Sequence, residues 1–380
     1  MINIVDKSKC CGCGACEQIC PAECLSMEPD NEGFLYPRIN KDLCISCDLC
    51  DEVCSFTKNN SDINPIGVFS GINKDERVRI KSSSGGLFTL LAEKVISKGG
   101  VVFGARFNEK WKVIHDYANN NSAIEKFLGA KYSQSEIRNN YVIAEKFLKE
   151  GRYVLFSGTP CQIAGLNSFL RDSYENLLSV EVACHGVPSP KVFEKYLKSF
   201  SDNIVSVNLR YGEESWKDYK IKIGYINKDR QEYVEHHDRD KYMNAFLSEI
   251  SLRPSCYNCR VKLGKSGCDL MLGDFWNVSN VMPEIDDDKG ISVALAYTKK
   301  GLEFISNIDA DLKNISFEDA CGCNGGFNEI VHEHPNRELF FNSIDETDSL
   351  ISLIDRCCNT LPFKYRIKRK AKHLLNKLNK

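Results

Sequence analysis

The chain has 380 residues, a length typical of two or three domains. Hydrophobic residues make up 42% of it and charged residues 27%, a balance that excludes an intrinsically disordered protein. The formal net charge is only −2, so we expect no nucleic-acid partner. The 19 cysteines are an odd number, and most recur at short, regular intervals. This pattern favours metal or redox chemistry in a reducing compartment over disulfides.

The first 60 residues contain two matched cysteine runs with the spacing of bacterial two-cluster ferredoxins. The first run is Cys10, Cys13, Cys16 and Cys20, followed by Pro21; the second is Cys44, Cys47, Cys50 and Cys54, followed by Ser55. In such runs three cysteines wrap one 4Fe–4S cluster, and we expect the fourth to start a helix directed at the other cluster. We therefore assign one cluster to Cys10, Cys13, Cys16 and Cys54, and the other to Cys20, Cys44, Cys47 and Cys50.

Zinc is a poor alternative for these runs, because a structural zinc ion takes four ligands and does not require eight in two matched sets. Cys11 and Cys24 lie outside the spacing, and we expect them to be spare or packing cysteines and not ligands.

From residue 66 onward the sequence alternates predicted strands and helices, as in a mixed α/β domain. A serine- and glycine-rich loop, 82–86, leads into a predicted helix that begins at Leu87. Backbone N–H groups at such a helix N-terminus suit an anionic phosphate, but an ordinary helix cap has the same appearance. Both interpretations remain open on the residues alone.

Two cysteines follow predicted strands of this domain. Cys161 comes after the strand at 152–158, and Cys184 comes after the strand at 177–183. In a parallel sheet both would lie at the carboxyl edge, where open α/β sheets bind their ligands. With the C-x2-C pair of Cys256 and Cys259 they are enough for a third cluster. Buried apolar cysteines are the alternative interpretation.

Seven motifs in a fixed order, covering residues 1 to about 330, resemble the coenzyme F420 hydrogenase/dehydrogenase beta-subunit family. They are the cysteine runs, Ser-Ser-Gly-Gly at 83–86, Gly-Ala-Lys-Tyr at 129–132, Gly-Thr-Pro-Cys-Gln at 158–162, Cys-His-Gly-Val-Pro at 184–188, Arg-Pro-Ser-Cys-Tyr-Asn-Cys at 253–259 and Gly-Asp-Phe-Trp at 273–276.

The resemblance implies an iron–sulfur flavoprotein. It implies a 4Fe–4S cluster on Cys161, Cys184, Cys256 and Cys259, and FAD held by Ser84, Gly85, Gly86, Lys131 and Asp274. The expected fold is a small ferredoxin-like domain followed by a larger mixed α/β flavin-binding domain. We place the boundaries at 1–60 (ferredoxin-like domain), 61–150 (flavin-binding part), 151–335 (part with the third cluster) and 336–380 (helical, basic tail).

The predicted function is an oxidoreductase that passes electrons between an external donor, 4Fe–4S clusters and FAD, and so reduces or oxidises an organic or deazaflavin substrate. The resemblance extends to enzymes of surface-polysaccharide biosynthesis, and no residue identifies coenzyme F420 itself. The alternative is an electron-transfer subunit that serves a partner enzyme and has no substrate of its own. We expect a redox partner protein or ferredoxin, and a small-molecule donor or acceptor.

The remaining features give weaker predictions. The N-terminus predicts no signal peptide, and no apolar run approaches the ~18 residues of a membrane span, so we expect a cytoplasmic protein. The basic C-terminal segment, 363–380, predicts either peripheral membrane contact or a helix docked on the chain's own acidic domain. The motifs assign no role to Cys268, Cys321, Cys323, Cys357 and Cys358.

Overall fold

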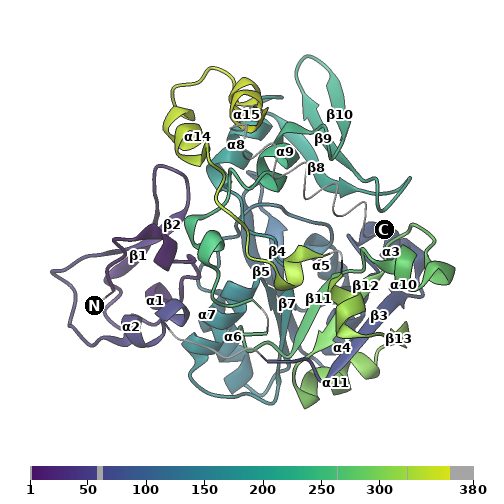
Figure 1. Cartoon of the computed structure of the whole chain (residues 1–380). Helices are drawn as coiled ribbons and strands as arrows, with labels where there is room; N and C mark the ends of the chain where they lie inside the picture. Colours follow the sequence, from purple (N-terminus) through teal and green to yellow (C-terminus); the bar gives the residue numbers. More distant parts are fainter. Residues whose placement is uncertain (1, 58–62, 263, 323, 360–380) are drawn as a thin grey trace.

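The computed structural model describes residues 2–57, 63–262, 264–322 and 324–359, in three parts that pack together (Figure 1). A small cysteine-rich domain lies on one side, a large α/β domain forms the centre, and a three-stranded sheet with four helices covers one end. The basic tail and Cys323 lie outside the described residues.

An eight-stranded mixed sheet forms the central domain, in the order β13-β3-β12-β11-β7-β6-β4-β5. The four middle strands β11, β7, β6 and β4 are parallel, and the outer pairings are antiparallel. The strands are β3 (Gly67–Asn73), β4 (Val101–Phe107), β5 (Val113–Ala118), β6 (Val154–Gly158), β7 (Leu177–Val182), β11 (Leu270–Asp274), β12 (Ser292–Ala296) and β13 (Ala310–Asn314).

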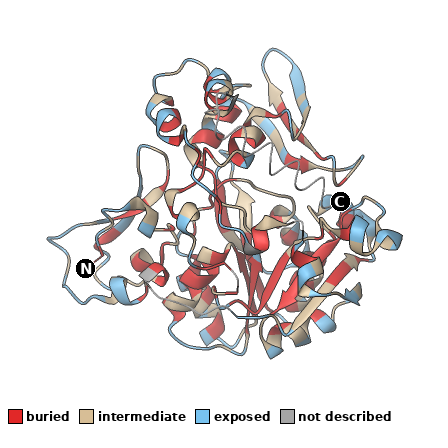
Figure 2. Cartoon of the chain, viewed as in Figure 1, coloured by how far each residue is buried: buried red, intermediate tan, exposed pale blue. Residues whose placement is uncertain are grey.

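Helices cover both faces of this sheet, since side chains of its buried strands alternate between two apolar cores. Phe156 of β6 packs into the core beneath α6 and α7, whereas the adjacent Leu155 packs into the core beneath α4. The sheet is therefore the middle layer of three, and Figure 2 shows its strands as the largest buried region. The helices are α3 (Glu76–Lys81), α4 (Leu87–Ser97), α5 (Asn121–Ile124), α6 (Asn140–Lys149), α7 (Pro160–Leu170), α10 (Val278–Val281), α11 (Lys299–Ser306), α12 (Phe317–Cys321) and α13 (Gly325–Asn328).

The second sheet is antiparallel, in the order β10-β9-β8, and shares a core with α8, α9, α14 and α15. Phe34 and Tyr36 of the N-terminal domain pack into this same core, so it joins that domain to the rest of the chain. The elements are α8 (Pro190–Lys198), β8 (Ile204–Tyr211), β9 (Lys220–Ile226), β10 (Arg230–His236), α9 (Lys241–Leu247), α14 (Arg337–Ser343) and α15 (Leu350–Asn359).

The N-terminal domain has a two-stranded antiparallel sheet, β1 (Leu25–Pro29) and β2 (Leu35–Ile39), and two one-turn helices, α1 (Ala15–Gln18) and α2 (Leu49–Glu52). Cys54 directly precedes a short 3-10 helix, Ser55–Thr57, as expected of the fourth cysteine of a run, whereas Cys20 starts no helix. Neither fourth cysteine lies in α1 or α2. Each helix contains the third cysteine, Cys16 or Cys50, because a left-handed residue before it, Gly14 or Asp48, turns the chain into the helix.

The expected fold class is confirmed: a small ferredoxin-like domain precedes a mixed α/β domain. The predicted strands and the loop at 82–86 lie where the pattern placed them. None of the helices in the described ranges is long and apolar enough to cross a membrane.

Candidate functional site

Three neighbouring strands, β6, β7 and β11, end at the same edge of the central sheet, and chemically active residues follow each one. Cys161 lies in the first turn of α7, which begins directly after β6. Pro160 at the first helical position and a reciprocal pair of hydrogen bonds between Thr159 and Gln162 stabilise the start of this helix. Cys184 follows β7, and Asp274 ends β11. The edge is the carboxyl edge, as the sequence pattern predicted.

Four cysteines predicted for the third cluster are brought together at this edge. The Cys184 thiol interacts electrostatically with those of Cys161, Cys256 and Cys259, although Cys259 is 98 residues from Cys161 in the chain. Burial raises the pKa of the Cys256 thiol to about 12 and raises the pKa of the Cys184 thiol well above its usual range. Thiolates are therefore costly here unless a positively charged group, such as the iron of a cluster, binds them. Four cysteine thiols are the donor set that a 4Fe–4S cluster takes, although no group of three or more ligand side chains in the described ranges is arranged to hold a metal ion.

The two N-terminal sets also assemble in the crossed pattern expected of a dicluster domain. The Cys16 thiol interacts electrostatically with those of Cys10, Cys13 and Cys54, the last of which comes from the second run. A small cavity is lined by the other four cysteines, Cys20, Cys44, Cys47 and Cys50, together with Cys24. Both donor sets fit 4Fe–4S clusters, and the second lies nearer the surface because Cys47 is exposed.

The first of these sets lies directly against the cysteines of the central domain. The Cys11 thiol is buried and interacts with the thiols of both Cys13 and Cys161. Interaction with Cys11 lowers the pKa of the Cys161 thiol to about 7. Cys11 was expected to be a packing residue; the structure places it at the junction of two cysteine sets, a position that its spacing alone does not reveal.

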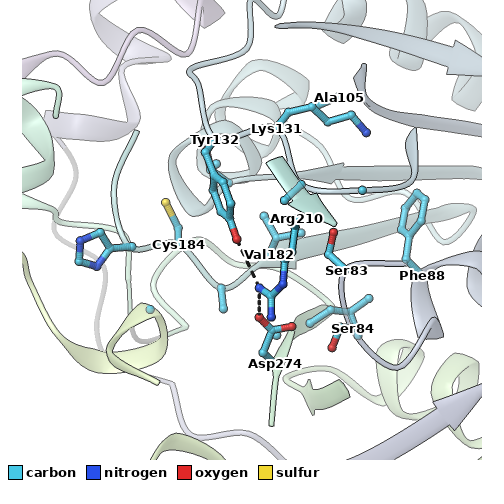
Figure 3. Close-up of a pocket in the computed structure, with 18 of the residues that line it drawn as sticks. Ser83, Ser84, Phe88, Ala105, Lys131, Tyr132, Val182, Cys184, Arg210 and Asp274 are labelled. Carbon is cyan, nitrogen blue, oxygen red and sulfur yellow. Dashed lines mark hydrogen bonds and ion pairs between the residues drawn. The ribbon is translucent and has the colours of Figure 1, made fainter. Parts of the chain in front are cut away.

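A cavity of about 700 Å³ opens at the same edge of the sheet, next to Cys184 (Figure 3). Its wall includes most of the 82–86 loop at the start of α4, the turn after β7, and one residue of β8, Arg210. The volume is within the range of cofactor sites. The Ser83 hydroxyl in this wall is buried and has no hydrogen-bond partner among the described residues.

Four of the five predicted flavin residues, Ser84, Gly86, Lys131 and Asp274, line this cavity. Gly85 does not. A Cβ at Gly85 would lie 2.3 Å from the carbonyl oxygen of Gly71 and 2.6 Å from the amide nitrogen of Ser292, so this glycine lets the loop pack on β3 and β12. Its contribution to the cavity is to support the loop that lines it.

The Lys131 side chain turns toward the backbone instead of projecting freely. Its Nζ donates to the carbonyl oxygens of Phe127 and Leu128, at 2.7 and 2.6 Å. Burial lowers the pKa of its ammonium group to about 7. Lys131 therefore provides a cation that is readily neutralised at the cavity wall.

Sequence reasoning missed Arg210, a buried residue of β8 that lines the cavity. Its Nη1 donates to Asp274 Oδ2 at 2.7 Å and to the Tyr132 hydroxyl at 3.3 Å, whereas Nε and Nη2 have no hydrogen-bond partner among the described residues (Figure 3). Its guanidinium lies 4.8 Å from the ring centres of Tyr219 and Trp276. The preceding strand residues give no motif, so only the fold reveals this cation.

Three histidines also reach the wall. His115 is buried; its Nε2 donates to the carbonyl oxygen of Ser157 at 3.0 Å, and its Nδ1 accepts from the Ser135 hydroxyl at 2.9 Å. Burial lowers the pKa of its imidazole to about 4. His185, next to Cys184, has a pKa lowered to about 4 by burial as well. His237 stacks on Tyr219 with ring centres 4.3 Å apart.

The remaining described cysteines are not among the predicted cluster ligands. Cys24 has its Sγ 3.4 Å from that of Cys20. Cys268 is buried near Ser266 and Glu181, and Cys357 is buried in the core beneath the second sheet. Cys321 is buried in α12, and Cys358 lies 3.4 Å from the Ser248 hydroxyl.

Comparison with known proteins gives two family matches. Residues 151–319 match the C terminus of the coenzyme F420 hydrogenase/dehydrogenase beta subunit, and residues 9–57 match the 4Fe-4S dicluster domain. The second match indicates two 4Fe–4S clusters. Among solved structures the chain is similar to one from the F420-reducing NiFe hydrogenase complex of Methanosarcina barkeri, with 16% identity, 77% of this chain and 91% of that chain covered, and a TM-score of 0.47. No curated protein matches.

Proposed function

We propose that this chain is an iron–sulfur flavoprotein oxidoreductase, because residues 151–319 match the C terminus of the coenzyme F420 hydrogenase/dehydrogenase beta subunit and residues 9–57 match a 4Fe–4S dicluster domain. Three 4Fe–4S clusters would connect an external one-electron donor or acceptor to FAD. The substrate would be an organic molecule or a deazaflavin, and a role in surface-polysaccharide biosynthesis stays a prediction.

The observation that carries this proposal is the continuous series of cysteine sets from the surface to the cavity. It starts at the exposed Cys47, continues through Cys13 and Cys11 to Cys161, and ends at Cys184 in the cavity wall. Such an order is what stepwise electron transfer between a surface partner and a buried cofactor requires. Metal centres that only stabilised the fold would not need to follow one another from the surface to the cavity.

The cavity has groups that suit FAD, the proposed occupant. The Ser83 hydroxyl and the Nε and Nη2 donors of Arg210 are buried without partners among the described residues, a costly state that a pyrophosphate or flavin oxygen would relieve. The start of α4, an 11-residue helix, adds backbone N–H groups and a favourable dipole for an anion.

When bound, the clusters carry single electrons and FAD couples them to two-electron chemistry. The protein's own residues would set the conditions for it. Arg210, held by Asp274 and Tyr132, presents a fixed positive charge to the cavity, and Lys131 adds a second whose charge changes near neutral pH. The neutral His115 ring fixes Ser135 and the end of β6 through its two hydrogen bonds.

The experiment that tests this function is an anaerobic inventory of iron, sulfide, zinc and extracted flavin in the purified protein. About twelve irons and one FAD per chain would support the proposal. About eight irons without flavin would contradict it and limit the redox chemistry to the N-terminal domain. Deazaflavin, nicotinamides and sugar nucleotides would then be screened as substrates.

A second candidate, an electron-transfer subunit without its own substrate, is favoured by the surface around Cys47. Leu43 and Ile45 are 55% and 65% exposed beside this cysteine, which suits docking of a redox partner protein or ferredoxin. Turnover of a small molecule by the isolated chain separates the two candidates. Reduced flavin that is reoxidised only by a partner protein would favour the second.

A further inference from the structure

Arg253 is a fully buried cation at the junction between the N-terminal domain and the third cysteine set. It lies three residues before Cys256, and its side chain reaches back to the first cysteine run. Its Nε donates to the carbonyl oxygen of Cys10 at 2.8 Å, and its Nη2 donates to the carbonyl oxygen of Leu35 at 2.8 Å. Nη2 also lies 3.7 Å from Cys10 Sγ. One guanidinium thus binds residues of the N-terminal domain that are distant from Arg253 in the chain.

No carboxylate pairs with Arg253 anywhere in the described ranges. Burying a cation without an anion is costly, so a charge-neutralising partner is expected nearby. The groups that surround it are thiols. Arg253 interacts electrostatically with Cys10 and Cys13 of the first set and with Cys161 and Cys256 of the third. Cluster-bound thiolates would provide the missing negative charge.

The neighbouring residues hold the guanidinium in this place. A Cβ at Gly12 would lie 2.7 Å from Arg253 Nη1, so only glycine lets the first run approach so closely. Gln134 accepts from Nη1 at 3.0 Å and donates to the carbonyl oxygen of Cys11 at 2.9 Å. The Tyr36 ring centre lies 4.3 Å from the guanidinium carbon. The charge is therefore fixed between the two sets.

We propose that Arg253 is the shared counter-cation of the first N-terminal cluster and the third cluster, and that it raises the reduction potential of both. Reduction adds one electron, and so one negative charge, to a cluster without breaking a bond. A fixed cation beside the cluster favours the reduced form and makes its potential more positive. Arg253 is a positioning residue in this role. The effect on the third cluster rests on the proposed function, whereas the effect on the first cluster does not.

The test compares Arg253→Lys, which keeps the charge, with Arg253→Gln, which keeps hydrogen-bonding capacity and loses the charge. The potentials of the clusters are measured in the whole purified protein by EPR during anaerobic titration with dithionite. We expect Arg253→Gln to shift the potential of the first cluster to more negative values, and Arg253→Lys to shift it less. The reduction potential of the third cluster should shift in the same direction.

Arg337 offers a matched control. It is also a buried arginine that joins the N-terminal domain to the rest of the chain, but it pairs with the carboxylate of Glu32, its Nη1 and Nη2 donating at 2.9 and 2.5 Å. Arg337→Gln should change the unfolding midpoint and leave the cluster potentials unchanged. Equal shifts in Arg337→Gln and Arg253→Gln would overturn the proposal, since loss of domain packing would then explain both.

The outcomes separate this proposal from the proposed function. A first-cluster shift in a protein with no third-cluster signal would uphold the role of Arg253 there and contradict the third cluster. Loss of iron from Arg253→Gln alone would support the need for the cation in cluster assembly. Equal potentials in the Gln and Lys variants, or loss of iron from both, would show that charge is not what this position requires.

Discussion

Gly165 of α7 packs directly against Cys13 of the N-terminal domain. A Cβ at Gly165 would lie 2.8 Å from Cys13 Cβ and 3.0 Å from its Sγ, and 2.9 Å from the Tyr141 hydroxyl. The glycine therefore lets the helix that carries Cys161 approach the first cysteine set. This contact sets the distance between two of the cysteine sets over which electrons would pass.

We predict that Gly165→Ala destabilises the protein by about 1–3 kcal/mol, because the added methyl group has no space. The sign of this change in stability distinguishes a tight contact from an open helix position. Alanine in an open helix position would stabilise by up to about 1 kcal/mol relative to glycine. Denaturant unfolding of the anaerobic protein measures the difference, and Ser168→Ala on the same helix is the control, expected to change stability by less than about 0.5 kcal/mol. A stabilised Gly165→Ala variant would mean that the two parts are not in tight contact.

Cys161→Ser should remove the third cluster and preserve the two N-terminal ones. We expect the iron content to fall by about four per chain and flavin reduction by dithionite-reduced clusters to slow. Cys268→Ser is the control, because Cys268 is a buried cysteine that contacts Ser266 and Glu181 instead of the other three cysteines. Iron analysis and EPR give the readout. Equal iron contents in the two variants would contradict the third cluster.

Removal of the Arg210 charge should weaken flavin binding. Hydrogen bonds to a charged group contribute about 1.5–3 kcal/mol, so Arg210→Met is expected to raise the dissociation constant of FAD roughly 10- to 100-fold. Flavin fluorescence during reconstitution measures this dissociation constant. The control is Arg106→Met, since Arg106 pairs with Asp116 at 2.7 Å and does not line the cavity. Unchanged affinity in Arg210→Met would exclude Arg210 from the FAD site.

Much of the fold and of the cysteine sets was predictable because the relevant signals are local. Strict spacing marks the two N-terminal runs, and apolar segments followed by Cys161 and Cys184 mark strand ends of a parallel sheet. The family resemblance is confirmed by the match over residues 151–319. The predicted flavin and third-cluster residues lie together at one edge of the sheet, and their roles stay predictions.

The residues that sequence reasoning missed act through contacts between distant segments. Arg210 is 64 residues from its partner Asp274, and Arg253 is 243 residues from Cys10. Arg210 belongs to no motif, and Arg253 begins the motif at 253–259 without any spacing that assigns a role to its side chain. The position of Cys11 is not evident from spacing for the same reason: its neighbour Cys161 is 150 positions away in the chain.

Acid should destabilise the protein through His115. Burial lowers the pKa of its imidazole to about 4 from 6.5, and the ring is only 2% exposed. Between these values the unfolded chain binds a proton that the folded protein excludes. Stability is therefore retained above pH 6.5 and lost as the pH falls from 6.5 toward 4, by about 2 kcal/mol at pH 5.

The measurement is the free energy of unfolding of the wild type and of His115→Gln at pH 7.5 and pH 5. Glutamine keeps a donor for the carbonyl oxygen of Ser157, which His115 Nε2 contacts at 3.0 Å, and has no titratable group. Every other acid-sensitive group, His185 and the clusters included, is common to both proteins and cancels in the comparison. The wild type should therefore lose more stability than the variant on acidification. Parallel losses would mean that His115 is protonated in the folded protein as readily as in the unfolded chain.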